Sequence, residues 1–374
     1  MTIRKPRKPA QLSKTIGSVA LLVAAWTCVS CGLISTSQFA TMRAIRKYGR
    51  GHQATPGTFS NSPVVQTSVD ALEEAGAYEE RMTQLLEAGN YDQLDAEAQK
   101  ISTGKDRLVG GGWELNTFYE AVYVPSHGSN MWAQQVDKLK TWVAKDPQSV
   151  TARVALANAY IGWGWQARGS GYSNSVSSGG WYWFGKSVGI AKATLIEVAR
   201  LPEKTPSWYS AMQKVAQAEG WSREDEKELF DQAVAFEPSY YYFYQYHAGF
   251  LLPKWYGEVG ETQAFINEVT AGIPEPDSSM LYFELSDSVA CQCDPDRDTL
   301  KDISWEKAKE GYANIERLYG TVNVKNNRYA YMAYMAGDKA AAKQAFALIG
   351  DKPGGFVWHD KNAFLEAKKW AETP

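Results

Sequence analysis

Apolar residues recur every three or four positions from about residue 69 to the C-terminus. This spacing places them on one face of a helix, as in amphipathic helices that pack on a core. No stretch shows the alternating, turn-bounded pattern of a strand. The pattern therefore predicts an all-α fold. The clearest stripes are Leu94, Ala98 and Ile101; Trp132, Val136, Leu139 and Val143; Val150, Val154, Ala157 and Ile161; Val188, Ala191, Leu195 and Val198; and Ala308, Tyr312, Ile315 and Tyr319.

Short polar breaks separate these helices and favour an arrangement in pairs. The breaks are Gly89-Asn90, Asp146-Pro147, Glu237-Pro238 and Gly337-Asp338. Glycine and proline at such positions end helices or begin turns. Small and aromatic residues near the breaks stand at offsets typical of tetratricopeptide repeats, whose period is about 34 residues. We therefore predict, over residues 69–374, an all-α, tetratricopeptide-like solenoid of helical hairpins built from degenerate repeats.

The N-terminus has the pattern of an export or anchoring segment. Residues 1–15 are basic, and residues 16–34 carry no charge over about the length of a membrane-spanning helix. Residues 35–68 follow as a predicted flexible linker, rich in Gly, Pro, Ser and Thr in its second half. Three interpretations stay open: a single-pass hydrophobic anchor helix, a lipoprotein with Cys31 as the lipidation site, and a cleaved signal peptide or buried helix.

The charge around this segment gives an expected location. The basic cluster before residues 16–34 is slightly larger than the one after them. Basic residues favour the cytoplasmic side of a membrane. We therefore expect a membrane-anchored protein with the bulk of the chain in the periplasm or another extracytoplasmic space.

Composition excludes several classes of protein. The 374 residues are 44% hydrophobic, which is too apolar for a disordered chain. The net charge of -3 provides no global basic field for nucleic acid. Four cysteines are too few for a disulfide-rich scaffold of this length. A folded protein without a nucleic-acid partner is expected.

Aromatic, glycine and proline residues also recur in a distinctive order between about residues 70 and 285. They are Gly112-Trp113-Glu114-Leu115, Phe118-Tyr119, Trp142, Pro147, Trp165-Gln166-Ala167-Arg168-Gly169, Trp208-Tyr209, Gly220-Trp221, Glu237-Pro238, Tyr240, Leu252-Pro253-Lys254-Trp255 and Gly257. This order resembles a bacterial family, domain of unknown function 4034, whose members are tetratricopeptide-like helical-repeat proteins. Gly164 departs from the family pattern, which has Ala there. The resemblance implies a helical solenoid and no particular chemistry.

Two short motifs match enzyme signatures, but their surroundings favour a structural role. Residues 180–187 match a P-loop, in which Lys186 and Ser187 would contact phosphates and magnesium. A P-loop follows a hydrophobic strand, whereas a Gly- and Ser-rich segment precedes this one. Residues 185–189 match a nucleophile elbow, which also requires a strand, and only His247 and His359 lie downstream as bases. We predict a helix start here, with at least two of its four aromatic side chains buried.

A cysteine pair precedes a run of aspartates whose spacing hints at a calcium loop. Pro295, Thr299 and Trp305 occupy positions at which such a loop needs other residues. Cys291 and Cys293 have no second Cys or His pair with which to hold zinc. We interpret the segment as a polar loop between helices, and a disulfide between the two cysteines stays open. No catalytic, cofactor-binding or metal-binding residue is assigned, and no cofactor is predicted.

Aromatic residues gather around a Gly- and Ser-rich segment, residues 169–180. Packing between repeats accounts for such clusters. The functional alternative is an aromatic-lined groove for a peptide or glycan, in which an arginine would anchor a carboxylate. The candidate groove residues are Trp163, Trp165, Arg168, Trp181, Trp183, Tyr242 and Trp255.

These observations lead to one function and one alternative. We expect a membrane-tethered helical-repeat protein that binds a protein or peptide partner and has no catalytic activity. The alternative is an enzyme, or a glycan- or peptide-binding protein, with its site at the aromatic groove around Arg168. A broad groove without clustered carboxylates or histidines favours the first, and a deep pocket that contains them favours the second.

Overall fold

The computed structural model describes residues 41–48, 71–125, 131–292, 302–354, 357–358 and 360–373. Within these ranges all regular structure is helical, apart from an isolated bridge between Arg107 and Trp113. The predicted all-α class is therefore confirmed for the described chain. The helices are α2 (Ala71–Glu87), α3 (Tyr91–Gly104), α4 (Glu114–Tyr123), α5 (Trp132–Lys145), α6 (Val150–Arg168), α7 (Ser178–Val198), α8 (Pro206–Glu219), α9 (Arg223–Phe236), α10 (Tyr242–Phe250), α11 (Glu261–Ala271), α12 (Asp277–Gln292), α14 (Trp305–Tyr319), α15 (Asn323–Ala336), α16 (Lys339–Ile349) and α17 (Lys361–Glu372), with a short 3-10 helix, η2 (Ser173–Ser175).

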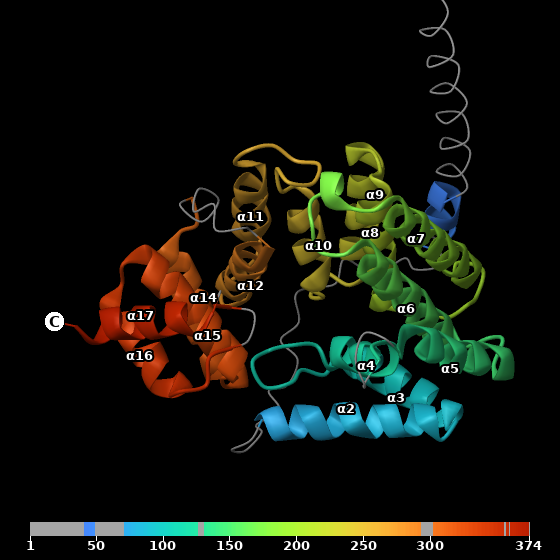
Figure 1. The fold of residues 1–374 in the computed structure, drawn as a ribbon, viewed down its shortest axis with the longest axis horizontal. Coiled ribbons are helices and arrows are strands. Elements are labelled where there is room, and N and C mark those ends of the chain that lie inside the picture. Colours follow the sequence, from blue (N-terminus) through green and yellow to red (C-terminus); the bar gives the residue numbers. More distant parts are fainter. Residues whose placement is uncertain are drawn as a thin grey trace, which may run out of the picture.

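Helices that are consecutive in the chain lie side by side through much of the molecule (Figure 1). The most extensive pairs are α6 with α7, α12 with α14, and α15 with α16. Contacts between α2 and α4, α8 and α10, and α10 and α12 connect neighbouring pairs. In Figure 1, α14 to α17 lie at the opposite end of the molecule from α5 and α7. The arrangement places the loops between α3 and α4 and between α6 and α7 in separate regions.

The polar breaks in the sequence end helices as predicted. Helix α5 ends at Lys145, before Asp146-Pro147, and α9 ends at Phe236, before Glu237-Pro238. Gly337 adopts a left-handed conformation after α15, and the Asp338 side chain then accepts a hydrogen bond from the backbone of Ala341 at the start of α16. Glycine takes this conformation without a Cβ penalty, and an N-cap carboxylate satisfies an unpaired amide.

The predicted apolar stripes form the core. Among the tryptophans, Trp113, Trp142 and Trp208 are completely buried. Gly311 on α14 allows close packing against α12, because a Cβ there would lie 1.9 Å from the carbonyl oxygen of Ser279. Of the stripe residues, Val143 is half-buried against the core. The others are buried, namely Leu94, Ala98, Ile101, Trp132, Val136, Leu139, Val150, Val154, Ala157, Ile161, Val188, Ala191, Leu195, Val198, Ala308, Tyr312, Ile315 and Tyr319.

Among the described residues, regular structure begins earlier in the chain than the sequence predicted. Residues 41–48, inside the predicted linker 35–68, form a helix whose end packs on the body. Tyr48 stacks on Trp208 with ring centroids 3.9 Å apart, and its hydroxyl accepts a hydrogen bond from the Thr205 amide. Arg46 forms an ion pair with Glu228 of α9. The linker prediction rested on a high content of Gly, Pro, Ser and Thr. That content does not reveal the aromatic packing of Tyr48, which holds this helix against the body.

The predicted anchor, residues 16–34, and the candidate lipidation site Cys31 lie outside the described residues. In the part of the chain that the structure does describe, no helix combines the length and apolarity needed to cross a bilayer. The basic segment 1–15 and the cysteine-aspartate loop from Cys293 to residue 300 also lie outside it.

Candidate functional site

Helices α6 and α7 bring part of the predicted aromatic groove together. The guanidinium of Arg168, at the end of α6, lies 5.3 Å from the ring centroid of Trp165 and 5.1 Å from that of Trp181. The same guanidinium donates hydrogen bonds to the carbonyls of Gly169 and Gly171. Trp255 meets Trp165 edge-to-face, with ring centroids 5.8 Å apart. We call Trp165, Arg168, Trp181 and Trp255 the Arg168 cluster.

The other predicted groove residues lie elsewhere. Trp163 stacks on Tyr160 of its own helix, with ring centroids 6.4 Å apart. Trp183 packs against Tyr182, and the Lys186 ammonium lies 4.8 Å from its ring centroid. Tyr242 lies on α10 and stacks on Tyr241, away from the Arg168 cluster. The structure thus brings Trp165, Arg168, Trp181 and Trp255 into contact, whereas the contacts of Trp163, Trp183 and Tyr242 are with other residues.

The expected burial of the aromatic residues at the start of α7 is wrong. Phe184 is buried, but Trp181, Tyr182 and Trp183 keep 40%, 62% and 50% of their surface exposed. The buried stripe of α7 begins at Gly180 and continues through Phe184 and Ser187. A helix buries one stripe against one neighbour, and the three exposed residues fall outside that stripe. They leave an aromatic surface in solvent.

The two enzyme-like motifs on α7 are helical, as predicted. The Ser177 side chain caps the helix by accepting a hydrogen bond from the Gly180 amide. Lys186 therefore lies in the third turn of a helix, and no strand precedes it in the described chain. Ser187 is buried beside Gly164, where an added Cβ would lie 3.2 Å from the Ser187 Cβ. A buried serine within a helix cannot act as the exposed nucleophile of an elbow.

His247 and Glu226 form a buried pair with the geometry of a catalytic dyad. The distance from His247 Nδ1 to Glu226 Oε2 is 2.6 Å. Phe230 stacks on the imidazole at 4.3 Å, and Phe265 meets its edge at 4.7 Å. A catalytic base must reach a substrate proton, directly or through one water. Because aromatic rings cover this imidazole and both residues are buried, the pair connects α9 with α10 structurally.

A shallow hollow between α2 and α4 is strongly acidic, with a volume of about 650 Å³. Burial, followed by the charge of Glu120, raises the pKa of Glu79. Within the described chain, no three histidine, cysteine or acidic side chains converge in a way that would hold a metal ion. The acidic residues that line the hollow are Glu79, Glu80, Glu87 and Glu120.

A second arginine, which the sequence analysis did not single out, lies in the loop between α3 and α4. Gly110 and Gly111 in this loop have φ angles of +83° and +81°, a conformation that suits glycine. The Leu108 amide donates to the Gly112 carbonyl, and the Gly110 amide donates to the Tyr319 carbonyl. These bonds fold the loop back on itself, attach it to the end of α14 and direct the Gly111 carbonyl toward Arg107.

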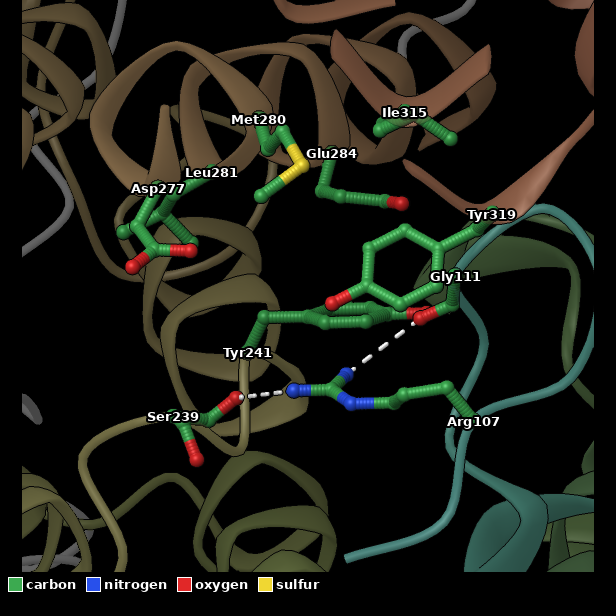
Figure 2. Close-up of a pocket in the computed structure, with 10 residues that line it drawn as sticks. All are labelled: Arg107, Gly111, Ser239, Tyr241, Asp277, Met280, Leu281, Glu284, Ile315 and Tyr319. Carbon is green, nitrogen blue, oxygen red and sulfur yellow. Dashed lines mark hydrogen bonds between the residues drawn. The ribbon is translucent and has the colours of Figure 1, made fainter. Parts of the chain in front are cut away.

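Arg107 is buried, with 9% of its surface exposed. Its guanidinium donates hydrogen bonds to the carbonyls of Gly111 and Ser239, at 3.2 Å and 3.1 Å (Figure 2). The guanidinium lies 4.0 Å from the Trp113 ring centroid and 5.8 Å from that of Tyr241. The Nε–H of Arg107 has no hydrogen-bond partner among the described residues. Burial lowers the pKa of this guanidinium, although an arginine side chain remains charged.

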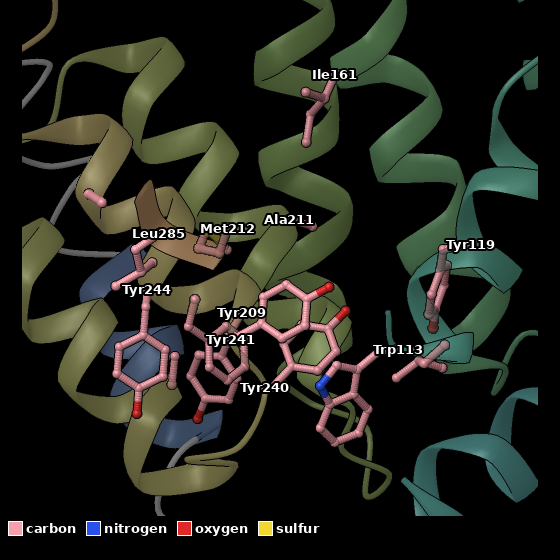
Figure 3. Packing of buried hydrophobic residues seen from close by; sticks show 14 of the residues in the cluster. Trp113, Tyr119, Ile161, Tyr209, Ala211, Met212, Tyr240, Tyr241, Tyr244 and Leu285 are labelled. Atoms are coloured by element: carbon pink, nitrogen blue, oxygen red, sulfur yellow. The ribbon is translucent and has the colours of Figure 1, made fainter. Parts of the chain in front are cut away.

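The rings around Arg107 belong to the aromatic core (Figure 3). Trp113 meets Tyr240 edge-to-face at 4.9 Å, and its indole N–H donates to the Ser239 carbonyl. Tyr241 stacks on Tyr242, and the hydroxyl of the first donates to that of the second at 3.1 Å. The loop between α3 and α4 is thus fixed to the turn between α9 and α10.

Arg107 borders a cavity of about 50 Å³ between this loop, the turn before α10, α12 and α14 (Figure 2). Apolar side chains and tyrosine rings form most of its wall. Glu284 forms an ion pair with Lys325 of α15. Burial raises the pKa of Asp277, and the charge of Arg107 counters part of this shift. The cavity is lined by Arg107, Gly111, Ser239, Tyr241, Asp277, Met280, Leu281, Glu284, Ile315 and Tyr319.

Little in the sequence pointed to this cavity. The three consecutive glycines from Gly110 to Gly112, next to an arginine and a tryptophan, were the only local signal. Comparisons of the chain with protein-family models, curated proteins and solved structures found no match.

Proposed function

We propose that this chain is a membrane-tethered helical-repeat protein that acts as a protein-interaction module and not as an enzyme. The side-by-side helix pairs and the glycine and proline breaks between them support a degenerate, tetratricopeptide-like solenoid. The same features fit the resemblance to domain of unknown function 4034. Repeat arrays of this kind present extended surfaces to partners.

One observation carries the proposal, namely the exposed aromatic surface at the start of α7. We call Tyr172, Trp181, Tyr182 and Trp183 the aromatic ridge, and all four side chains are exposed. Monomeric proteins rarely leave large apolar groups together in solvent, and such surfaces often mark interaction sites. Tryptophan and tyrosine are also the residues that most often dominate the energy of protein interfaces.

The charge around the ridge indicates the chemistry of the partner. Residues 147–196 contain no Asp or Glu, and they include the basic residues Arg153, Arg168, Lys186 and Lys192. Opposite charge on a partner would speed association and favour the correct orientation. The aromatic ridge therefore fits an acidic segment of a partner protein, with hydrophobic side chains that pack against the tryptophans.

The position of the ridge agrees with a partner close to the membrane. Figure 1 shows the helix of residues 41–48 and the first turns of α7 at the same upper edge of the molecule. The predicted anchor, residues 16–34, ends only a few residues before Thr41. If this anchor spans the bilayer, the aromatic ridge faces the space next to the membrane, on the extracytoplasmic side.

The exposed tryptophans also favour a second candidate, glycan binding at the Arg168 cluster. Aromatic rings that are free on one face can stack on sugars, and Arg168 lies between two of them. An enzyme has less support, because no described carboxylate forms an ion pair with Arg168, which bonds to backbone carbonyls instead. Catalysis would need an acid or a base close to the bound ligand.

The test is crosslinking and affinity capture of the full chain from membranes. Replacement of Trp181, Tyr182 and Trp183 by serine should reduce the captured partner at least tenfold, because each contact residue is worth about 1–2 kcal/mol or more. A matched control replaces Leu348 and Leu365, which are exposed on α16 and α17, by serine. Equal capture by the ridge variant and the wild type would contradict the proposal. Binding of the ridge to oligosaccharides, without a protein partner, would support the second candidate.

Tethering has its own test. A chain that lacks residues 1–34 should appear in the soluble fraction, whereas the full chain should resist extraction from membranes. Replacement of Cys31 by serine separates the two anchors: loss of membrane retention indicates a lipoprotein, and unchanged retention indicates a spanning helix. Retention of the truncated chain would refute the predicted anchor.

A further inference from the structure

The cavity beside Arg107 contains a buried positive charge that the protein only partly compensates. No described carboxylate forms an ion pair with Arg107, and its polar partners are two backbone carbonyls. The Nε–H is buried and unpaired. A buried charge is costly unless an opposite charge and hydrogen bonds compensate it. The guanidinium thus retains an unpaired donor, and its charge has no ion-pair partner among the described residues.

We propose that this cavity is a binding site for a small organic acid, whose carboxylate pairs with Arg107 and whose short carbon chain lies against the apolar wall. This site is separate from the aromatic ridge, and the inference does not depend on the proposed function. A guanidinium matches a carboxylate in shape as well as charge, since its N–H groups form a planar fork.

The wall of the cavity determines which carbon chain the acid can carry. Met280, Leu281 and Ile315 provide apolar contacts, and the rings of Tyr241 and Tyr319 also line the cavity (Figure 2). A volume of about 50 Å³ exceeds the space that one ordered water requires, yet it is far smaller than the pockets that hold drug-sized ligands. The cavity therefore suits an acid with a chain of a few carbons.

Neither carboxylate in the wall forms an ion pair with Arg107, although both carry a charge that attracts it. Glu284 is already paired with Lys325, so this pair is close to neutral as a unit. Asp277 faces the same cavity from the first turn of α12 without an ion-pair partner among the described residues. Its charge would oppose a bound anion. Removal of the Asp277 charge should therefore strengthen binding of the acid. This gives the proposal a test in which Arg107 stays intact.

A purely structural role for Arg107 makes a different prediction. Its bonds to Gly111 and Ser239 hold the loop between α3 and α4, and they need no ligand. The Ser239 carbonyl already accepts a second hydrogen bond, from the Trp113 indole. A structural arginine would give no preference between an acid and its uncharged amide.

The test uses the full chain in detergent micelles, with sodium propionate as the probe and propionamide as its uncharged match, at constant ionic strength. Saturation-transfer NMR should show saturable binding of propionate, with at least tenfold weaker binding of propionamide. Arg107→Lys should weaken propionate binding at least tenfold, because an ammonium lacks the planar fork. Arg317→Lys, a matched control at an exposed arginine on α14 that does not line the cavity, should leave binding unchanged.

Asp277→Asn keeps the proposal testable if the Arg107 variant does not fold. This substitution should tighten propionate binding about threefold, by removing a nearby like charge, and should not affect propionamide. Equal binding of propionate and propionamide would overturn the proposal. So would an unchanged affinity in a folded Arg107→Lys variant, or weaker propionate binding in Asp277→Asn.

Discussion

Arg107 and Arg168 make the same kinds of contact in opposite environments. Each guanidinium lies near the ring of a tryptophan and donates hydrogen bonds to two backbone carbonyls. The partners of Arg168 are local, since Gly169 and Gly171 are within three residues of it. One partner of Arg107, Ser239, is 132 residues away. Arg168 thus closes a loop, whereas Arg107 joins distant parts of the fold around a cavity.

The comparison separates two ways in which a cation can serve a protein. The Arg168 cluster lies at the surface, where water screens the charge and the aromatic residues remain available to a partner. Around Arg107, burial removes water and strengthens every electrostatic contact. We therefore connect the exposed region with association and the buried region with a small ligand.

The largest expected effect on stability is at Phe184, the buried residue next to the aromatic ridge. Phe184 is buried between Trp165 and Trp181, at centroid distances of 4.8 Å and 5.9 Å. Phe184→Ala should reduce the free energy of unfolding by about 4 kcal/mol, as for other buried aromatic residues. The neighbouring Trp183→Ala should reduce the free energy of unfolding by about 0.5 kcal/mol, because half of this side chain is exposed to solvent. Urea unfolding of the chain without residues 1–34, followed by circular dichroism, measures both; similar losses would show that the ridge is part of the core.

The two arginines provide the next comparison. Arg107→Ala should cost about 3 kcal/mol, since it leaves the buried Gly111 carbonyl without a donor and opens space beside Trp113. Arg168→Ala should cost less than about 1 kcal/mol, because solvent can replace the bonds that this side chain donates. The same unfolding measurement applies to both variants. A loss at Arg168 as large as that at Arg107 would remove the distinction between them.

Much of the fold was predictable from local patterns. The apolar stripes of α6, α7 and α14 lie in the core, and the break at Gly337-Asp338 separates α15 from α16 as predicted. These features depend on residues three to seven positions apart, or on one turn. The helix of residues 41–48 was missed because its stability depends on contacts with Thr205, Trp208 and Glu228, all distant in the chain.

The candidate sites show the same limit. Arg168 was found because its tryptophans and glycines surround it in the sequence. Tyr242, grouped with them in the sequence, stacks on Tyr241 instead, since clustering of aromatic residues does not reveal which helix neighbours which. The cavity at Arg107 combines residues of two loops, of α12 and of α14, and these residues span more than half of the chain. No local spacing encodes such a meeting, which depends on how the helix pairs stack.

Two glycines whose carbonyls accept hydrogen bonds from these arginines allow a finer comparison. Gly111 and Gly169 have nearly the same φ, +81° and +79°. An added Cβ at Gly111 would lie 3.3 Å from the Tyr319 ring, whereas one at Gly169 would meet nothing within 4 Å. Gly169→Ala should therefore cost about 1 kcal/mol from backbone strain alone, and Gly111→Ala about 2 kcal/mol from strain and crowding together. Thermal unfolding of the pair measures the difference, and equal melting temperatures would mean that Tyr319 yields without cost.

The smallest expected effect is at Lys186, the residue that completes the P-loop match. Its ammonium lies 4.8 Å from the Trp183 ring centroid and 6.0 Å from that of Tyr182, both exposed. A cation–π contact at an exposed site is worth about 0.5–1 kcal/mol, and alanine recovers part of that through its higher helix propensity. Lys186→Ala should therefore change the free energy of unfolding by no more than about 0.5 kcal/mol. In a parallel titration, ATP with magnesium should give no saturable binding to either protein. Saturable nucleotide binding by the wild type that disappears in Lys186→Ala would restore the P-loop interpretation, and it would assign the start of α7 to a ligand instead of a partner protein.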